Sequence, residues 1–380
     1  MYTTTSNTHD HASILKIGFD AKRAFNNHSG LGNYARFVIG GLIKMYPQHQ
    51  FYLFTPSIKP EFENIFAHHK NVHLITPKSF LGKTFKALWR TYSVVTLLNK
   101  LGVNVYHGLS NELPADIKKF NGKSIVTIHD LIFLRYPNYY KKIDREIYNR
   151  KFLKACKNAS FVVAASKQTA HDIEHFYHTS PPKIKVVYQN CHAQFETKLT
   201  QEAIKNTSTK YNLPDNYIVC IGTIEERKQQ LMVLQAFHQS NVNCNLVFVG
   251  KQTPFVIVLK NYIHQHQLSN KVQFIEGASF SDFPAFYQGA CLAVYASEFE
   301  GFGIPVLESL HSGVKVAVAN TSSLTEVGGN AVHYFENAAQ LTQLFNNINN
   351  LKVDELEINL QLKKFKTETL LHQLMDVYTN

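Results

Sequence analysis

The feature that most limits the fold is an alternation of short apolar runs with amphipathic stretches, which continues through nearly the whole chain. Most of the apolar runs have the length of a strand and are rich in Val and Ile, as is typical of strands buried on both faces. The stretches between them have helical periodicity. Strand and helix in repeated alternation predict an α/β fold built on parallel sheets.

The predicted strands fall into two groups separated by a polar segment. Those of the first half are residues 14–19, 51–54, 72–75, 103–107, 124–129 and 161–165, and those of the second half are 217–222, 245–250, 272–276, 292–296 and 314–319. After residues 332–335 the chain is predicted to be helical to its end. Helical patterns of the second half are residues 230–239, 255–266, 305–312, 338–349 and 353–378. We therefore expect two sheets in tandem.

The chain has 380 residues, enough for two domains. Residues 191–216 are polar and contain no strand-like run, so we interpret them as a link with one short helix. The expected organisation is an N-terminal Rossmann-like domain over residues 1–195, a second over 196–350, and a helix over 351–380 that crosses back to the first. Two such domains would face each other across a cleft, with ligands at the carboxyl ends of the strands.

Charge is distributed unevenly between the two halves. Residues 1–190 carry 26 basic and 11 acidic side chains, whereas residues 191–380 carry 13 and 17. The chain is 44% hydrophobic and 18% charged, which excludes a disordered or low-complexity protein. It contains no apolar run long enough to span a membrane and no apolar signal-peptide core near Met1. We expect a cytoplasmic protein whose halves meet different partners.

Five cysteines are scattered along the chain and form no CxxC pair. Cys220, Cys244 and Cys291 lie in or beside apolar runs. This pattern predicts small buried side chains in a reducing compartment, with no role in disulfides or zinc binding.

The strongest local motif follows the apolar run 292–296. Gly301 and Gly303 allow the backbone to approach a ligand closely, and the helix that follows would present free N–H groups to anionic or hydroxyl oxygens. Glu300 precedes this helix and Glu308 lies about one turn inside it. From spacing alone, a capping acid and a surface acid on an ordinary βα unit explain the two glutamates equally well.

Three further groups of candidate residues follow predicted strands: a basic pair, a pair of glycines and two histidines. Arg227 and Lys228 follow the run 217–222 at a helix start, where the helix dipole disfavours solvated cations and so favours an anionic ligand. Gly30 and Gly32 form a Gly-x-Gly turn that is weak evidence by itself. His129 ends the run 124–129, and His107 ends the preceding one; either could face a cleft or simply be hydrogen-bonded in a loop.

Several segments together resemble retaining glycosyltransferases of family 4, which have the GT-B fold. The resemblance rests on Glu300-x7-Glu308 within EFEGFGIPVLESLHSGVKVAVANTSSLTEVGGNAVHYF, and on YIVCIGTIEERKQQLMVLQAF, LVFVGK, VQFIEGASFSDFPAFYQGACLAVYAS, IGFDAKRAFNNHSGLGNYARFVIGGL, VYHGLSNELP, IVTIHDLIFLRYPNYY and VVAASKQTAHDI. It covers residues 14–340 and is strongest in the C-terminal half. The form TIHDL…LRYP is most similar to bacterial mannosyltransferase-like members. The family usually has Asn where this chain has Gln229.

The resemblance implies a metal-independent, retaining hexosyltransferase that uses a nucleotide-diphospho-sugar as donor substrate and no other cofactor. The acceptor would be a glycan or a lipid-linked glycan in cell-surface polysaccharide synthesis. Catalytic roles are implied for Glu300, His129 and Lys228. Donor binding is implied for Gly30, Gly32, Gly222, Arg227, Lys228, Glu300, Gly301, Phe302, Gly303 and Glu308. The alternatives are a sugar-nucleotide epimerase or a phosphorylase on the same fold, or a catalytically silent binding module.

The basic N-terminal half suggests an anionic acceptor and a peripheral site at the inner membrane face. In residues 78–100, Lys83, Lys86 and Arg90 alternate with aromatic residues at spacings that allow one exposed helical face. The alternative is an ordinary surface helix with lysines above a buried stripe. Nucleic acid is not expected as a partner, because the sequence contains no recognition motif for it.

Overall fold

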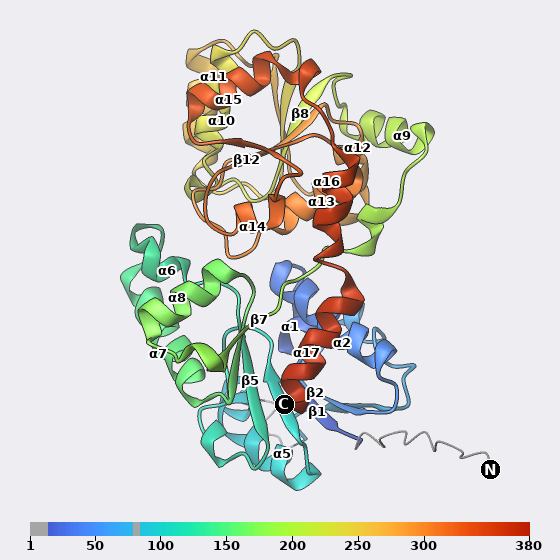
Figure 1. The fold of residues 1–380 in the computed structure, drawn as a ribbon, viewed down its shortest axis with the longest axis vertical. Coiled ribbons are helices and arrows are strands. Elements are labelled where there is room, and N and C mark those ends of the chain that lie inside the picture. The colour runs from blue at the N-terminus through green and yellow to red at the C-terminus, as the bar shows by residue number, and fades with distance from the viewer. Residues whose placement is uncertain (1–13, 79–83) are drawn as a thin grey trace, which may run out of the picture. The chain divides into compact units, whose positions relative to one another are not determined.

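The computed structural model describes residues 14–78 and 84–380 (Figure 1). The described chain divides into two compact units. One comprises the described residues of Met1–Val126 together with Asn158–Ser160, and the other comprises Thr127–Lys157 with Phe161–Asn380. Among the described residues, no helix combines the length and apolar character needed to cross a membrane.

The first half of the chain builds a seven-stranded sheet in the order β3-β2-β1-β4-β5-β6-β7. The strands are β1 (Lys16–Asp20), β2 (Gln50–Phe54), β3 (Val72–Ile75), β4 (Val105–Gly108), β5 (Lys123–Ile128), β6 (Phe161–Ala164) and β7 (Ile184–Val186). The helices are α1 (Lys22–Asn26), α2 (Gly30–Met45), α4 (Lys86–Leu88), α5 (Val94–Leu101), α6 (Ile132–Arg135), α7 (Lys142–Asn158) and α8 (Lys167–Tyr177), with a π-helical turn at Trp89–Ser93. The strand pairs with assigned registers are parallel, as their continuously apolar sequences predict.

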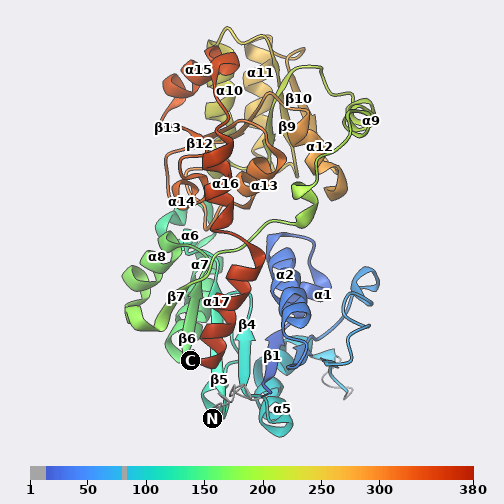
Figure 2. The same ribbon diagram turned by 45° about the vertical axis from the view of Figure 1, so that its right-hand side comes forward.

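The second half builds a six-stranded parallel sheet in the order β10-β9-β8-β11-β12-β13. The strands are β8 (Tyr217–Ile221), β9 (Asn245–Val249), β10 (Val272–Ile275), β11 (Leu292–Tyr295), β12 (Val316–Ala319) and β13 (His333–Phe335). The helices are α9 (Gln201–Tyr211), α10 (Gln230–Gln239), α11 (Val256–Gln265), α12 (Phe283–Gln288), α13 (Ile304–Ser312), α14 (Leu324–Gly328), α15 (Ala338–Asn346), α16 (Glu355–Lys363) and α17 (Thr367–Thr379). Figures 1 and 2 show α10, α11 and α15 on one face of this sheet and α12 and α13 on the other.

The prediction of two parallel-sheet α/β domains is confirmed, and the predicted strands match observed ones to within about two residues. Two short strands, β7 and β13, were not predicted: β7 includes a lysine and has no clear apolar pattern, and β13 has only three residues. The predicted helix over residues 353–378 is two helices, α16 and α17, interrupted at residues 364–366. In the link, α9 is the expected short helix, and Phe195 before it packs in the C-terminal core.

The expected basic face at residues 83–90 needs correction. Lys83 lies outside the described residues, and Lys86 is exposed. Arg90, however, is not on that exposed face: its side chain is 20% exposed, its Nε lies 3.0 Å from Asp20 Oδ2, and it also pairs with Glu112. Trp89 is buried in an apolar cluster with Phe54 and other residues of the first unit. Because Arg90 pairs with two carboxylates and Trp89 is buried in the core, these residues do not form the predicted exposed basic face.

The prediction for the cysteines is also only partly right. Cys220 in β8 is buried, as expected for a small side chain in an inner strand. Cys244 and Cys291 are only partly buried, and their thiols contact each other. Each directly precedes a strand, and a residue at the rim of a sheet is less completely covered than one inside it.

Candidate functional site

The candidate site lies at the carboxyl ends of β8 and β11, which are neighbouring parallel strands and so end at the same edge of their sheet. After β8, Gly222 has a φ of 148°, a backbone conformation that favours glycine, and a short 3-10 turn at Glu226–Lys228 carries the basic pair. After β11, the loop from Ser297 leads to Gly303, which caps α13 with a φ of 116°. Two loops and two helix starts thus converge on one edge.

Glu300 is the centre of the charges at this edge. Its carboxylate forms an ion pair with the Lys228 ammonium, and Oε2 lies 3.4 Å from Nη1 of Arg227. Burial raises the pKa of Glu300, but the charges of Lys228 and Arg227 outweigh it and bring the pKa down to about 2. Glu300 is therefore a carboxylate held ionised by two cations.

Arg227 is fixed in place by more than this pair. Its Nη1 donates to the Phe299 carbonyl at 2.6 Å and its Nη2 to Glu225 Oε1 at 2.6 Å. Burial lowers the pKa of Arg227, and the neighbouring carboxylates of Glu300 and Glu225 more than reverse this, so that the pKa is raised. A rigid guanidinium beside a more mobile ammonium is a suitable arrangement for a diphosphate.

The loop that carries Glu300 is held by hydroxyl groups after β12. The Glu300 amide donates to Ser322 Oγ at 3.1 Å, and Ser323 Oγ donates to the Glu300 carbonyl at 2.8 Å. Both serines are in a TSS sequence whose function was not recognised from the sequence. They orient the carboxylate without touching it.

The segment after β5 contacts the same loop. A Cβ added at Gly301 would lie 2.3 Å from the His129 carbonyl, so only glycine allows this approach. Thr169 Oγ1 lies 3.1 Å from the His129 carbonyl and 3.2 Å from the Gly301 carbonyl, and so ties the two segments together. His129 itself is 8% exposed. The structure thus brings His129 and Gly301 together through their backbones.

Asp130 and a tyrosine pair are residues that sequence reasoning missed. Burial raises the pKa of Asp130, while Arg227 acts in the opposite sense. Tyr140 lies close enough to Asp130 and Arg227 to feel both charges, although burial is the main cause that raises its pKa to about 12. Tyr139 donates to Glu298, which follows β11. The tyrosines stand in the quoted segment LRYPNYY, but nothing in their spacing indicates these partners.

Glu308 lies in a different environment, inside α13. Its Oε2 accepts a hydrogen bond from Tyr287 at 3.0 Å, and Tyr295 donates to Tyr287 at 2.8 Å. The residue is 7% exposed, and burial raises its pKa to about 7, despite the opposing hydrogen bond from Tyr287. No cation is among the causes of this shift. Glu308 is thus a carboxyl poised between its neutral and ionised forms near neutral pH.

The other residues that the sequence singled out are Phe302, Gly30, Gly32 and Gln229, and each lies in a different local environment. Phe302 is buried, with its ring 5.6 Å from Phe365 and 5.9 Å from Tyr188. Gly30 and Gly32 open α2, as predicted, although α1 intervenes between them and β1. A Cβ at Gly32 would lie 1.9 Å from the Asn27 carbonyl, whereas one at Gly30 would meet open space. Gln229 adopts a left-handed backbone conformation with a φ of 54°, and its side-chain amide hydrogen-bonds to Tyr139.

The arrangement can bind an anion and stabilise developing negative charge through Arg227, Lys228 and free helix N–H groups. Within residues 14–78 and 84–380, no group of three or more His, Cys, Asp or Glu side chains is placed to hold a metal ion.

His107 is fully buried beside Phe19, with ring centroids 6.2 Å apart, which fits a structural role.

Comparison with known proteins gives two family matches. Residues 28–189 match the family model described as Glycosyltransferase Family 4, and residues 201–368 match the one described as Glycosyl transferases group 1. O-antigen chain mannosyltransferase B of Escherichia coli is 27% identical over 233 residues, which are 60% of this chain and 60% of that protein. O-antigen chain mannosyltransferase RfbU of Salmonella typhimurium is 25% identical, over 55% of each. The chain thus spans little more than half the length of these curated relatives.

Among solved structures, Anabaena HepE in complex with UDP and glucose superposes with a TM-score of 0.73 at 16% identity, covering 96% of this chain and 99% of that one. At this identity the likeness bears on the fold alone. It agrees with the two parallel sheets described above.

Proposed function

Because the chain belongs to glycosyltransferase family 4, with the GT-B fold, we propose that it transfers a hexose from a nucleotide-diphospho-sugar to a glycan or lipid-linked acceptor in cell-surface polysaccharide synthesis. The similar curated proteins are O-antigen chain mannosyltransferases, which supports mannose as the first sugar to test. Retention of the anomeric configuration and independence from metal ions belong to this proposal.

The observation that carries the proposal is the cluster of Arg227, Lys228 and Glu300 at the carboxyl edge of β8 and β11. We propose that the donor diphosphate, when it binds, replaces Glu300 as the ionic partner of Lys228. The two cations would then face the departing nucleoside diphosphate and neutralise the charge that develops on it. Glu300, released from the ammonium, would lie beside the donor sugar ring.

The proposed donor site also uses the helix starts. Free N–H groups at Gly301, Phe302 and Gly303 would contact sugar hydroxyls and phosphate, and Gly222 leaves room for the ligand because nothing lies near its absent Cβ. Glu308 would hydrogen-bond the ribose, as the acid of dinucleotide-binding folds does. Its low exposure implies that only one edge of the carboxyl reaches the ligand.

His129 and the N-terminal glycines would complete the site. His129 follows β5 and lies against Gly301, which supports a role next to the transferred sugar or the acceptor. Donor binding by Gly30 and Gly32 of the N-terminal domain belongs to the same proposal. The domain boundaries at residues 195 and 350 belong to this proposal. The gap between the two family matches, at residues 190–200, supports the first boundary.

The final helix is proposed to pack on the N-terminal domain. Apolar residues of α17 such as Leu370, Leu374 and Tyr378 are buried, as a helix that packs on other parts of the chain requires.

An epimerase, a phosphorylase or a silent binding module is not favoured, because the two family matches and the curated relatives are glycosyltransferases. The chain also retains Arg227, Lys228, Glu300 and Glu308, which a silent module does not need.

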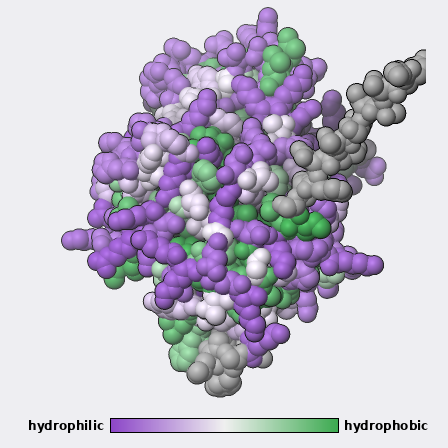
Figure 3. Space-filling view, turned by 60° about the horizontal axis from the view of Figure 1, so that its bottom comes forward, coloured by the Kyte–Doolittle hydropathy of each residue, from purple (hydrophilic) through white to green (hydrophobic). Residues whose placement is uncertain are grey.

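A peripheral contact with an anionic membrane is a finer part of the proposal. Lys86 lies among apolar side chains that are half exposed: Phe85 is 53%, Leu88 55% and Tyr92 59% exposed. On the face drawn in Figure 3, hydrophobic residues form separate patches among hydrophilic ones. Such a surface fits weak, salt-sensitive binding. Flotation with anionic but not neutral liposomes, reduced by Lys86→Glu, is expected; equal flotation on both lipids contradicts it.

The transferase proposal is tested with UDP-, GDP- and ADP-linked hexoses. We expect one donor to raise the thermal stability, by about 2.7 kcal/mol at a hundredfold excess over its Kd, and to be consumed when an acceptor is present. NMR of the product should show the anomeric configuration of the donor. A folded protein that binds none of these donors contradicts the proposal, and an inverted product contradicts retention alone.

A further inference from the structure

Two half-buried cysteines lie at the edge of the C-terminal sheet opposite the proposed donor site. Cys244 directly precedes β9 and Cys291 directly precedes β11, and β8 lies between these two strands. Arg227 and Glu300 follow the carboxyl ends of β8 and β11, whereas the cysteines stand at the amino ends. The thiols of Cys244 and Cys291 contact each other, and Cys291 Sγ also lies 3.9 Å from Asn216 Oδ1. Cys156, Cys191 and Cys220, by contrast, are buried.

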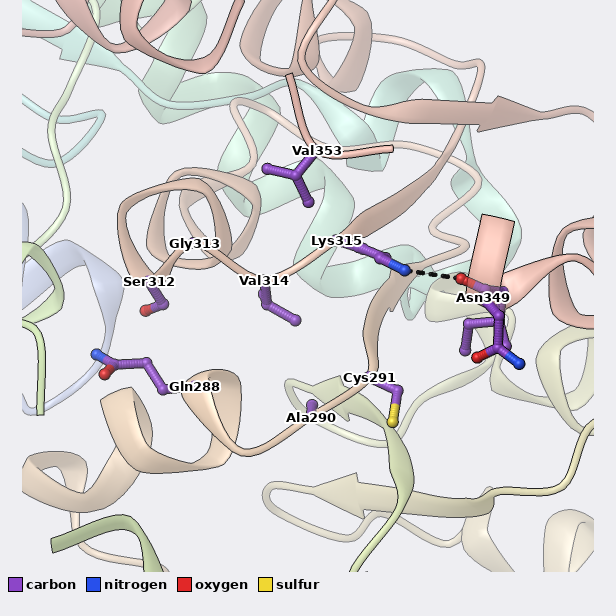
Figure 4. Close-up of a pocket in the computed structure, with 10 residues that line it drawn as sticks. Gln288, Ala290, Cys291, Ser312, Gly313, Val314, Lys315, Asn349 and Val353 are labelled. Carbon is purple, nitrogen blue, oxygen red and sulfur yellow. Dashed lines mark hydrogen bonds between the residues drawn. The ribbon is translucent and has the colours of Figure 1, made fainter. Parts of the chain in front are cut away.

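A cavity of about 320 Å³ opens beside Cys291. Figure 4 shows its polar side chains, Gln288, Ser312, Lys315 and Asn349, on three sides of the Cys291 side chain. Lys315 directly precedes β12, the neighbour of β11, and its Nζ donates to the Ile348 carbonyl at 2.9 Å. No carboxylate is among the described residues that line the cavity. Its one charged group is therefore a cation, which suits a small ligand with carboxylates.

The two thiols have opposite ionisation tendencies. The hydrogen bond with Cys244 is the main cause that lowers the pKa of Cys291, and the charge of Lys315 adds to it. The same hydrogen bond and burial raise the pKa of Cys244. The lowered pKa favours Cys291 as the group of the pair that loses its proton first, and the thiolate is the nucleophilic form of cysteine.

We propose that Cys291 is a site of reversible S-thiolation by a small anionic disulfide, of the class to which glutathione disulfide belongs. The Cys291 thiolate attacks one sulfur of the disulfide, a bond forms between the two sulfurs, and the original S–S bond breaks. The departing thiolate leaves with the bonding electron pair and takes a proton from water. The protein sulfur is oxidised, half of the small disulfide is reduced, and excess thiol reverses the step.

The sheet geometry explains why the mixed disulfide would persist. The registers place Asn245 beside Tyr217 and Leu292 beside Ile218, so the two cysteines flank β8 near its first residue. Strands on either side of a third are about 9.5 Å apart. A disulfide usually joins Cα atoms about 4.4–6.8 Å apart, so Cys244 cannot displace the bound group without backbone movement.

The full-length protein is incubated with glutathione disulfide at pH 7 and mapped by mass spectrometry. We expect one adduct, on the peptide with Cys291, removed by excess reduced glutathione and lost in Cys291→Ser. Cys220→Ser serves as the control, because that thiol is buried in the same sheet. An adduct on another cysteine, no adduct, or a Cys244–Cys291 disulfide in its place overturns the proposal.

A second measurement follows the alkylation of Cys291 by iodoacetamide as a function of pH, which requires no change in sequence. The rate should reach half its maximum clearly below the value of about 8.5 for a free cysteine. In Cys244→Ala, loss of the Cys244 thiol should move the midpoint upward and slow alkylation at pH 7 by about tenfold. Lys315→Gln should move it in the same direction by less. A wild-type midpoint at or above 8.5 overturns the proposal.

Discussion

Two glutamates eight residues apart occupy opposite electrostatic environments, although both are buried. Glu300 lies in the loop after β11 with Lys228 and Arg227, and its pKa falls to about 2. Glu308 lies within α13 against Tyr287, and its pKa rises to about 7. Burial pushes both pKa values upward, so the difference comes from the cations. The cations keep the carboxyl in the loop ionised, whereas the helix interior allows its carboxyl to be neutral.

The largest expected effect comes from removing one cation at Glu300. Lys228→Ala should lower kcat and kcat/KM together, on the order of 10²-fold, because the ammonium acts most strongly as negative charge develops on the diphosphate. Steady-state kinetics of donor turnover measure this. Lys271 is an exposed lysine directly before β10, and Lys271→Ala is the matched control, which should leave the kinetics unchanged. An unchanged kcat with a raised KM would limit Lys228 to ground-state binding.

The second prediction concerns the raised pKa of Glu308. Because the unfolded chain loses this proton near pH 4.5 and the folded chain near pH 7, the contribution of the group to stability is complete below pH 4.5 and is lost as the pH rises to 7. Glu308→Gln keeps an acceptor for Tyr287 and removes the titration. The unfolding free energy of Glu308→Gln minus that of wild type should be higher at pH 7.5 than at pH 4.5, by on the order of 2–3 kcal/mol.

Urea unfolding at the two pH values gives this difference directly, with other titrating groups cancelling between the two proteins. Suppose that the unfolding free energies of Glu308→Gln and wild type differ by the same amount at both pH values. The pKa of Glu308 would then be the same in the folded and the unfolded chain, which contradicts the prediction.

A smaller effect is expected from the tie between His129 and Gly301. Thr169→Val removes the hydroxyl that lies between the two carbonyls and should lower the unfolding free energy by about 1 kcal/mol. Thr169→Ser keeps the hydroxyl and should retain most of the stability. If serine and valine are equally destabilising, the hydroxyl does not hold the loop.

The smallest expected effect is that of a chelator. Arg227 and Lys228 supply the positive charge at the proposed diphosphate site, so donor turnover in EDTA should equal that without it. Loss of turnover in EDTA, restored by Mg²⁺ or Mn²⁺, would mean that a metal ion shares this role.

Local patterns in the sequence were enough for the strands and for the two-sheet fold, because buried parallel strands are continuously apolar. The resemblance to the family predicted Arg227, Lys228 and Glu300 as site residues, and the structure brings these three side chains together. Local patterns did not reveal contacts made far along the chain, such as Arg90 with Asp20 or the hydrogen bond between Cys244 and Cys291. The break between α16 and α17 was missed because residues 364–366 contain no glycine or proline. Pairings of this kind depend on the fold, and neither spacing nor composition records them.

The central claim, that Arg227 and Lys228 bind the diphosphate of the donor, is tested most directly by calorimetric titration with UDP, GDP and ADP in the presence of EDTA. One nucleoside diphosphate should bind the wild-type protein and Lys271→Ala equally, and Lys228→Ala about tenfold more weakly or worse, since the free diphosphate carries the charge that develops during transfer. Equal affinity for wild type and Lys228→Ala, or no binding of any of the three, would contradict the claim.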